Sequence, residues 1–353
     1  MRVLFLQDHL RIGGTEKQTL ALGAFGKSIG IETGVIVFRP GGALPVRPSS
    51  YSFYKVLQPF NTRVDEWAPG IIRKIKSFKP DVIVFMGKVA HLYFPPIRKY
   101  LPEITLVSTY RSGKPPVAYY RKALQEADGV ITNSDAEHKR LIRPWGIPKE
   151  LIRTVHNGCL ISDTDEETQS STEELRLLCT AMFRPQKNQL ELLSILASLP
   201  DSIRWTCTFA GTGKMLKPCQ KKARELGIQD QVTFTWSKHP ASLYETHDVL
   251  VHTSDKESLP NSLIEAQTFG LPVVAYLTNG VGECFEEGVS GFGIPFGEQA
   301  AFRDALHLLS LDADKRKTMS QAARKFARER FDFEDRSKEF FNTLREIHAA
   351  KKR

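Results

Sequence analysis

Short apolar runs alternate with longer helical patterns along the whole chain, and this alternation limits the fold more than any other feature. In the first part of the chain, strand-like runs occupy residues 3–6, 34–38, 82–86, 105–108, 129–133 and 155–157, and helical patterns occupy residues 16–29, 65–78 and 116–126. After residue 174, strand-like runs return at 175–181, 205–210, 232–235, 249–252 and 273–275, between helical patterns at 187–197, 216–226, 241–244, 260–269 and 300–309. Continuous apolar strands between helices are typical of a parallel sheet covered on both faces. The sequence therefore predicts an α/β protein with two doubly wound domains in tandem.

The stretch between the two series is acidic, rich in hydroxyl side chains and almost free of apolar residues. Such a composition is typical of an exposed linker. We therefore predict a first domain over residues 1–158, a linker over 159–174 and a second domain over 175–330. Helical patterns at 314–329 and 333–350 close the chain, and the segment 331–353 is long enough to return to the first domain. Two domains also suit a length of 353 residues, at roughly 100–200 residues per domain.

The net charge of +9 is unevenly distributed. Residues 1–155 hold 24 Lys and Arg against 12 Asp and Glu, whereas residues 156–353 hold 25 against 28. The runs 71–79 and 93–100 interleave cations with apolar residues, a pattern that suits contact with an anionic membrane surface. A solvated basic face explains these runs equally well. No nucleic-acid-binding motif accompanies the charge, so we expect no nucleic-acid partner.

Two further features concern the location of the protein. The longest apolar runs, 82–86 and 271–277, are far shorter than the roughly 20 residues that a membrane span needs. The five cysteines are scattered and form no CxxC pair, so the sequence supports neither a disulfide framework nor a zinc site. We expect a cytoplasmic protein.

The segment 255–275 carries the richest chemistry. A strand-like run ends near Ser254, and Pro260 suits the first position of the helix that follows. The first amides of a helix lack partners within it and attract anions, which makes the amides around Leu259 and Asn261 a candidate phosphate cradle. Glu257 lies just before this helix and Glu265 lies within it, so two carboxylates would flank the cradle. Carboxylates beside a phosphate suit the binding of ribose or sugar hydroxyls, although two solvated surface residues remain the alternative.

Basic and glycine-rich loops follow the first strands of the two series. Arg184 and Lys187 follow the strand at 175–181 and could neutralise a diphosphate, or could simply be exposed cations. Gly13 and Gly14 follow the strand at 3–6 and would allow close approach of a ligand or of another backbone segment. They do not form the GxGxxG dinucleotide fingerprint. Gly213-Lys214 resembles only a fragment of a P-loop, and we interpret His252 as a satisfied core residue.

With these features the sequence resembles the retaining GT-B glycosyltransferases of family 4 over nearly its whole length. The resemblance is most specific in the two glutamates separated by seven residues, Glu257 and Glu265. It continues in order through Ala266, Gly270, Pro272, Val273, Val274, Ala275, Gly280, Glu283, Gly288 and Gly291. Gly13 and Gly14 look like the family's N-terminal glycine loop, and Asn133-Ser134 and Asn157-Gly158 look like its interdomain markers.

The resemblance implies two Rossmann-like domains that face each other across a cleft, with the C-terminal helix crossing back. It also implies the roles of the site residues. Glu265 would bind the donor ribose, Glu257 the donor sugar, and Arg184 and Lys187 the nucleoside diphosphate. The backbone of Ser258, Leu259, Pro260 and Asn261 would complete the phosphate cradle, and the segment 235–239, including His239, would lie against the base. No metal and no cofactor would be needed, because the cations and the helix end replace them.

Three features depart from the family pattern. Ser258 stands where the family usually has glycine, and the two cations are three residues apart rather than five. Tyr110 and Arg111 stand where many members carry a histidine, which makes both candidates for the acceptor side.

The resemblance implies a glycosyltransferase that moves a sugar, with retention, from a nucleotide-diphosphate sugar, with a UDP-sugar favoured. The acceptor would be a glycan or a lipid-linked molecule of cell-envelope biosynthesis, handled in the cytoplasm or at the inner face of the plasma membrane. The alternatives are another GT-B enzyme, such as a nucleotide-sugar epimerase or a sucrose-type synthase, and an inactive scaffold that binds nucleotide sugars.

Overall fold

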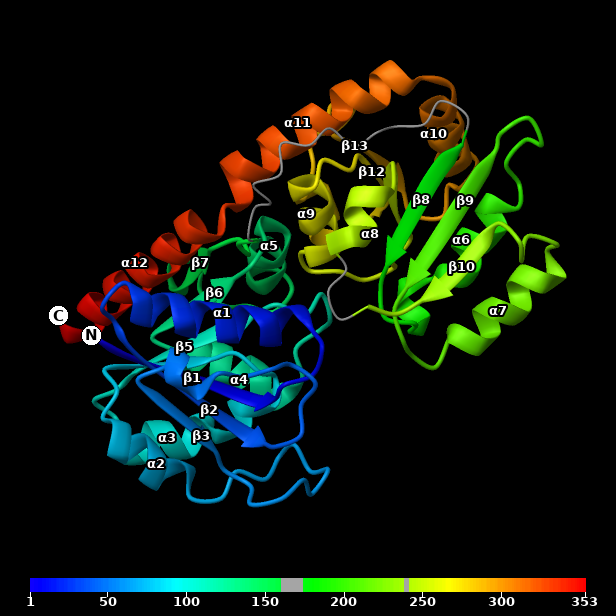
Figure 1. Ribbon diagram of the computed structural model, residues 1–353. Coiled ribbons are helices and arrows are strands. Elements are labelled where there is room, and N and C mark those ends of the chain that lie inside the picture. The colour runs from blue at the N-terminus through cyan, green and yellow to red at the C-terminus, as the bar shows by residue number, and fades with distance from the viewer. Residues whose placement is uncertain (160–173, 238–240) are drawn as a thin grey trace. The chain divides into compact units, whose positions relative to one another are not determined.

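The chain forms two compact units, each built around its own parallel sheet (Figure 1). The computed structural model describes residues 1–159, 174–237 and 241–353. Unit 1 comprises residues 1–158 together with 333–353, and unit 2 comprises residues 159–332. The chain therefore passes between the units twice, once after Gly158 and once after Asp332.

Unit 1 contains a seven-stranded sheet in the order β3-β2-β1-β4-β5-β6-β7, with all neighbours parallel. The strands are β1 (Arg2–His9), β2 (Glu32–Arg39), β3 (Phe53–Val56), β4 (Val82–Phe85), β5 (Thr105–Tyr110), β6 (Gly129–Thr132) and β7 (Ile152–Thr154). The helices are α1 (Gly14–Ser28), α2 (Ile71–Phe78), α3 (Phe94–Tyr100), α4 (Ala118–Glu126), α5 (Asp135–Ile142) and α12 (Phe333–Lys352). The strand order reverses between β1 and β4, and ligands of open α/β sheets bind at the carboxyl ends of strands beside such a reversal.

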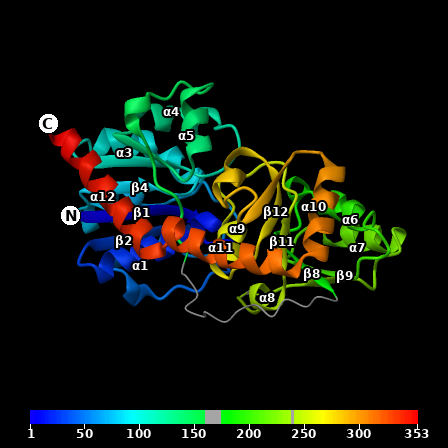
Figure 2. The same cartoon turned by 90° about the horizontal axis from the view of Figure 1, so that it is seen from above.

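The last helix of the chain, α12, completes one face of the unit 1 core. Figures 1 and 2 show it beside α1. Phe340 and Phe341 are buried on this face, and the ring of Phe340 stacks on Phe5 of β1 at a centroid distance of 6.2 Å. Small residues make room for the helix: a Cβ added at Gly26 would lie 2.5 Å from the Phe341 ring, and one at Gly129 would lie 2.6 Å from Ile347.

Unit 2 contains a six-stranded sheet in the order β10-β9-β8-β11-β12-β13, again parallel throughout. The strands are β8 (Leu175–Thr180), β9 (Trp205–Ala210), β10 (Val232–Thr235), β11 (Val249–His252), β12 (Val273–Leu277) and β13 (Gly291–Pro295). The helices are α6 (Gln189–Leu196), α7 (Leu216–Glu225), α8 (Ala241–Thr246), α9 (Asn261–Thr268), α10 (Gln299–Leu311) and α11 (Ala313–Phe331). Helices α6, α7 and α10 cover one face of the sheet, and α8, α9 and α11 cover the other. The order reverses between β8 and β11, which is where the loops carrying Lys187 and Glu257 begin.

Several elements differ from the predicted pattern. The prediction omits β3, β13, α3 and α5, and it places a strand at 155–157 where the structure has β7 at 152–154. Strand β3 is a short edge strand that is only partly buried, so it lacks the apolar signal of the central strands. Strand β13 contains two glycines that fit closely against β12: a Cβ at Gly291 would lie 2.5 Å from Val273, and one at Gly293 would lie 2.6 Å from Leu277. The start of α5 is set by a cap, since the Ser134 hydroxyl accepts a hydrogen bond from the amide of Glu137.

The helix predicted over 65–78 begins at Ile71. Gly70 precedes it with a φ of +67°, a conformation that favours glycine and is incompatible with a continuing right-handed helix. The helix buries Ile71, Ile75 and Phe78 in the unit 1 core. These three residues are therefore unavailable to a membrane, and Ile72 is only partly exposed, whereas Arg73 and Lys76 are exposed. Among the helices of the described residues, none is long and apolar enough to cross a membrane.

Candidate functional site

Two loops at the carboxyl edge of the unit 2 sheet bring Lys187 and Glu257 together. The first follows β8 and ends in a short 3-10 turn, η4 (Pro185–Lys187), and the second joins β11 to α9. The Thr253 hydroxyl donates to the carbonyls of Lys187 and Asn188 at 3.3 and 3.2 Å. The amide of Asp255 donates to the Gln186 carbonyl at 3.0 Å. These bonds fix one loop against the other, so the two side chains meet although 70 residues separate them.

Lys187 and Glu257 form a largely buried ion pair, with side-chain exposures of 20% and 12%. Burial alone would raise the pKa of Glu257, but the positive charge of Lys187 and the contact with His252 outweigh it and lower the pKa to about 2. Glu257 is therefore ionised at neutral pH. It can accept hydrogen bonds from hydroxyl groups and cannot act as a proton donor there.

His252, at the end of β11, is the third member of this cluster. It is buried, as predicted for a core residue, and its Nε2 lies 3.2 Å from the Glu257 carboxylate. Burial lowers its pKa below the ordinary value of 6.5, so the ring is neutral at pH 7. Because an ionised carboxylate only accepts hydrogen bonds, Nε2 must carry the proton and donate it. Sequence reasoning missed this contact, because it depends on how the 253–256 loop turns back.

The backbone after Glu257 leads directly into α9. Asn279, in the 3-10 turn η5 (Asn279–Glu283), donates from Nδ2 to the carbonyl of Glu257 at 2.8 Å. Ser258, Leu259 and Pro260 are all buried. Pro260 is the N-cap residue and α9 starts at Asn261, one position later than predicted. The first amides of α9 thus lie directly after the buried carboxylate, as a phosphate cradle requires.

Glu265 lies on α9 beside a buried tyrosine. The hydroxyl of Tyr244 donates to Glu265 Oε2 at 2.8 Å and also lies 3.0 Å from the hydroxyl of Thr180, the last residue of β8. Sequence reasoning missed Tyr244, which the sequence shows only as an aromatic residue in a short helical pattern.

Arg184 lies at the start of η4 and is exposed. Its guanidinium makes no hydrogen bond within the described ranges, so it is available to a ligand. The loop after β9 packs tightly against this segment: a Cβ at Gly211 would lie 2.0 Å from the Ala181 carbonyl, and the amide of Phe183 donates to the Thr212 carbonyl at 2.8 Å. The two glycines around Thr212 therefore serve backbone packing and do not form a P-loop. His239 lies outside the described residues.

Unit 1 carries the remaining predicted residues. Gly13 is the N-cap of α1, which starts at Gly14, and a Cβ at Gly13 would lie 2.3 Å from the Glu16 carboxylate. Tyr110 is fully buried and its hydroxyl donates to the Lys114 carbonyl. Arg111 follows it and donates from Nη1 to the Asn157 side chain at 2.5 Å.

The polar atoms of Arg111 are only partly satisfied. Its Nε is buried and lacks a hydrogen-bond partner among the residues that the structure describes. Burial lowers its pKa to about 10, so it remains charged at neutral pH. Of the two acceptor-side candidates, Arg111 is therefore the one with donor capacity left.

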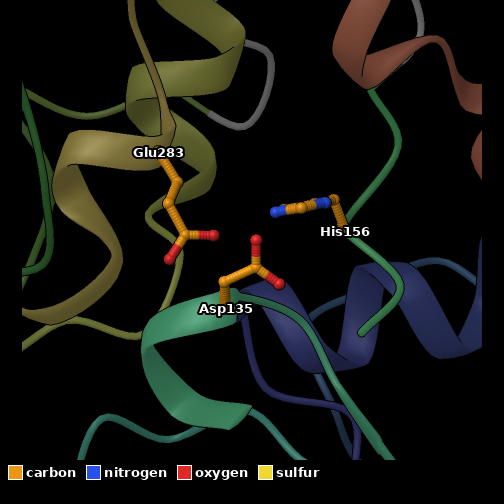
Figure 3. Close-up of side chains that lie close together, drawn as sticks. All are labelled: Asp135, His156 and Glu283. Carbon is orange, nitrogen blue, oxygen red and sulfur yellow. The ribbon is translucent and has the colours of Figure 1, made fainter. Parts of the chain in front are cut away.

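Asp135 and His156 also lie at the carboxyl edge of the unit 1 sheet, at the start of α5 and just after β7 (Figure 3). A carboxylate oxygen and a ring nitrogen lie within 4.8 Å of each other. Glu283, which Figure 3 also labels, ends η5 of unit 2. Two ligands from one unit are too few for a structural zinc site, and we assign no metal to them.

Comparison with known families accounts for both units. The sequence model of the Glycosyltransferase Family 4 matches residues 12–161, and that of the Glycosyl transferases group 1 matches residues 161–326. The chain belongs to the group 1, family 4 glycosyltransferases. The family predicted from the spacing of Glu257 and Glu265 is thereby confirmed.

Two curated relatives show how far the similarity extends. The Vi polysaccharide biosynthesis protein VipC/TviE of Salmonella typhi is 34% identical over 139 residues, which is 38% of this chain and 24% of that protein. The D-inositol 3-phosphate glycosyltransferase of Corynebacterium urealyticum is 28% identical over 249 residues, 64% of this chain and 58% of that protein. The matches thus span from about a quarter to a little over half of the relatives' own length.

Solved structures share the fold. HepE of Anabaena in complex with UDP superposes with a TM-score of 0.82 at 22% identity, over 98% of this chain and all of that one. Sucrose-phosphate synthase of Thermosynechococcus elongatus gives a TM-score of 0.84 at 18% identity, over 99% of this chain and all of that one. The predicted GT-B fold is confirmed.

Proposed function

We propose that this protein is a retaining glycosyltransferase that uses a nucleotide-diphosphate sugar, most favourably a UDP-sugar, as its donor. The observation that carries the proposal is the cluster of Lys187, Glu257 and His252 just before the N-terminus of α9, with Glu265 further along the same helix. A lysine and helix amides suit a diphosphate, and two carboxylates suit hydroxyl groups. HepE structures in complex with UDP and with UDP-glucose support the choice of nucleotide.

In the proposed reaction the acceptor hydroxyl attacks the anomeric carbon from the same face of the sugar ring as that from which the leaving group departs. The bond between that carbon and the diphosphate oxygen breaks, the new glycosidic bond forms, and the acceptor proton passes to the departing diphosphate. Lys187 and Arg184 stabilise the negative charge that develops on the diphosphate. In this scheme the backbone amides of Ser258, Leu259 and Asn261 help to stabilise the same charge. Neither a metal ion nor a cofactor takes part in this scheme.

The two carboxylates have separate tasks. Glu257 is ionised and faces Lys187, so it would accept a hydroxyl of the donor sugar beside the reacting bond. Glu265 would accept a hydroxyl of the donor ribose. On this scheme the rate comes from positioning and from charge stabilisation, which fits a site whose buried carboxylate is held unprotonated.

The expected result of replacing Glu265 with alanine is a tenfold or greater loss of affinity for nucleoside diphosphate, since a hydrogen bond to a charged group contributes about 1.5–3 kcal/mol. A thermal-shift screen of nucleotide sugars first identifies the donor, and isothermal titration with UDP then measures the loss of affinity. Glu245→Ala, which removes an exposed glutamate of the neighbouring helix α8, is the control and should bind UDP like the wild type. Unchanged affinity of the Glu265 variant would contradict the assignment.

The alternatives make different products. An epimerase would convert the nucleotide sugar without any acceptor, and a sucrose-type synthase would accept a free sugar; the fold shared with sucrose-phosphate synthase leaves this second activity as an alternative. An inactive scaffold would bind the donor without turnover. Analysis of the products formed with and without acceptor separates these cases.

We propose that the acceptor is a glycan or lipid-linked molecule of polysaccharide or lipopolysaccharide biosynthesis, bound at the carboxyl edge of the unit 1 sheet near Arg111. The match to the Vi polysaccharide biosynthesis protein supports this class.

The proposal also includes action in the cytoplasm, at the inner face of the plasma membrane. Three exposed cations support the membrane contact: Arg73 and Lys76 on helix α2, and Lys79, the C-cap residue directly after it.

Because Ile71, Ile75 and Phe78 of α2 are buried, its binding to a membrane should be mainly electrostatic and sensitive to salt. Each cation near an anionic surface contributes about 1 kcal/mol, so the triple change Arg73→Gln, Lys76→Gln and Lys79→Gln should weaken vesicle binding by at least about tenfold at low salt. Co-sedimentation with phosphatidylglycerol vesicles measures the effect. The control removes three exposed cations of α7 instead, at Lys217, Lys221 and Arg224. Equal binding by both triple variants, or no binding by the wild type, would count against the membrane contact.

A further inference from the structure

The hydroxyl of Tyr244 links three elements of unit 2 at the proposed ribose-binding carboxylate. Tyr244 lies on α8, Glu265 on α9, and Thr180 at the carboxyl end of β8. The tyrosine oxygen lies 2.8 Å from Glu265 Oε2 and 3.0 Å from Thr180 Oγ1. The side chain is 1% exposed, so water does not compete for these bonds.

The direction of each hydrogen bond follows from the chemistry of the groups. Burial raises the pKa of Tyr244 well above its ordinary value, so the phenol keeps its proton. The phenol has one proton to donate, and a carboxylate group accepts hydrogen bonds. The tyrosine therefore donates to Glu265, and Thr180 must donate to the tyrosine. The three groups form a directed chain of hydrogen bonds that ends on one oxygen of the carboxylate.

Packing fixes the position of the tyrosine ring. The ring stacks on Phe269, the C-cap residue of α9, with a centroid distance of 5.3 Å and an interplanar angle of 12°. It also belongs to the buried cluster that contains Leu259 and Leu263. A ring held between the two helices in this way places its hydroxyl at a defined point relative to α9.

We infer that Tyr244 is a positioning residue that orients the Glu265 carboxylate toward the donor ribose, so that discrimination between ribose and deoxyribose nucleotides depends on its hydroxyl. The inference rests on the proposed function, in which Glu265 receives the ribose. Tyr244 does not contact the ligand in this scheme. Its hydroxyl occupies one carboxylate oxygen and thereby restricts the rotation of the Glu265 side chain.

The test compares UDP with 2′-deoxy-UDP as ligands of the wild type and of Tyr244→Phe, by isothermal titration. The phenylalanine variant keeps the ring and its stacking and loses only the hydroxyl. We expect the wild type to bind UDP about tenfold or more tightly than the deoxy ligand, since the lost hydrogen bond is to a charged group. In the variant this ratio should fall to threefold or less, mainly through weaker binding of UDP.

Two further variants make the result specific. Thr180→Val removes the donor to Tyr244 and should lower the ratio by a smaller factor. Tyr51→Phe removes the hydroxyl of another buried tyrosine, which donates to the Leu20 carbonyl in unit 1, and should leave the ratio unchanged. Circular dichroism and thermal unfolding of each variant verify that it is folded.

The outcomes separate the inference from the proposal on which it rests. A wild type that fails to bind UDP, or that binds the two ligands equally, contradicts the assigned role of Glu265. A wild type that discriminates while Tyr244→Phe discriminates equally well overturns the positioning role alone. An equal loss of affinity for both ligands in the phenylalanine variant also overturns it, because a purely structural defect has that effect.

Discussion

Replacing Lys187 with alanine should reduce the rate of sugar transfer by about a hundred- to a thousandfold, the range seen when one preorganised group that stabilises developing charge is removed. The structure fixes the lysine at the proposed site of the leaving group: its carbonyl accepts a hydrogen bond from Thr253, and its ammonium contacts Glu257. The diphosphate would depart without its principal cation. Steady-state kinetics with the donor identified by screening measure the effect on kcat and on KM.

A matched control separates this loss from a general effect of charge. Lys221 on α7 forms an exposed pair with Glu225, with side-chain exposures of 75% and 51%, and pairs of this kind contribute about 0–1 kcal/mol to stability. Lys221→Ala should therefore retain full turnover. Lys187→Arg keeps the charge and should recover part of the lost rate. Full activity in Lys187→Ala would show that this lysine does not stabilise the leaving group.

Glu257 should make the stability of the protein sensitive to acid. Its folded-state pKa of about 2 lies below the ordinary value of 4.5, so its ionised form stabilises the folded state at all pH values above about 4.5. That contribution is about 3 kcal/mol, and it is lost as the pH falls from about 4.5 toward 2. Urea unfolding at pH 6 and at pH 3 should show the wild type losing about 2 kcal/mol through this residue.

The Glu257→Gln variant provides the comparison. It should be less stable than the wild type at pH 6, because Lys187 loses its buried partner, and the difference should shrink at pH 3. Glu225→Gln, the exposed glutamate of α7, should follow the wild-type profile. A constant difference between Glu257→Gln and the wild type across this pH range would mean that the ion pair does not control the ionisation of Glu257.

The sequence predicts the parts of this fold that follow from local patterns. Central strands such as β1 and β11 contain continuous apolar runs, and the spacing of Glu257 and Glu265 spans a loop and a helix within one short segment. Both signals are local, so neither needs knowledge of distant contacts. The edge strand β3 and the capped helix α5 were not predicted because their sequence signals are weaker. Strand β3 is only partly buried, and the start of α5 is marked by a single serine cap.

The contacts that set the chemistry of the site lie beyond local patterns. The pairing of Lys187 with Glu257 depends on loops from two strands that reach the same edge of the sheet. The donation from His252 depends on how the 253–256 loop turns back. The contact of Tyr244 with Glu265 depends on the packing of α8 against α9. Tyr110 shows a related limit. A strand covered on both faces gives no sign of which side chains remain free, so only the structure shows that its hydroxyl is bound to the Lys114 carbonyl.

The place of α12 has a consequence for synthesis on the ribosome. Residues 1–158 of unit 1 are synthesised before unit 2, yet the helix that covers one face of their core is synthesised after it. Until α12 has left the ribosome, Phe5 and the neighbouring apolar residues on that face lack the covering helix. The first part of unit 1 therefore keeps one face of its core uncovered while the whole of unit 2 is synthesised.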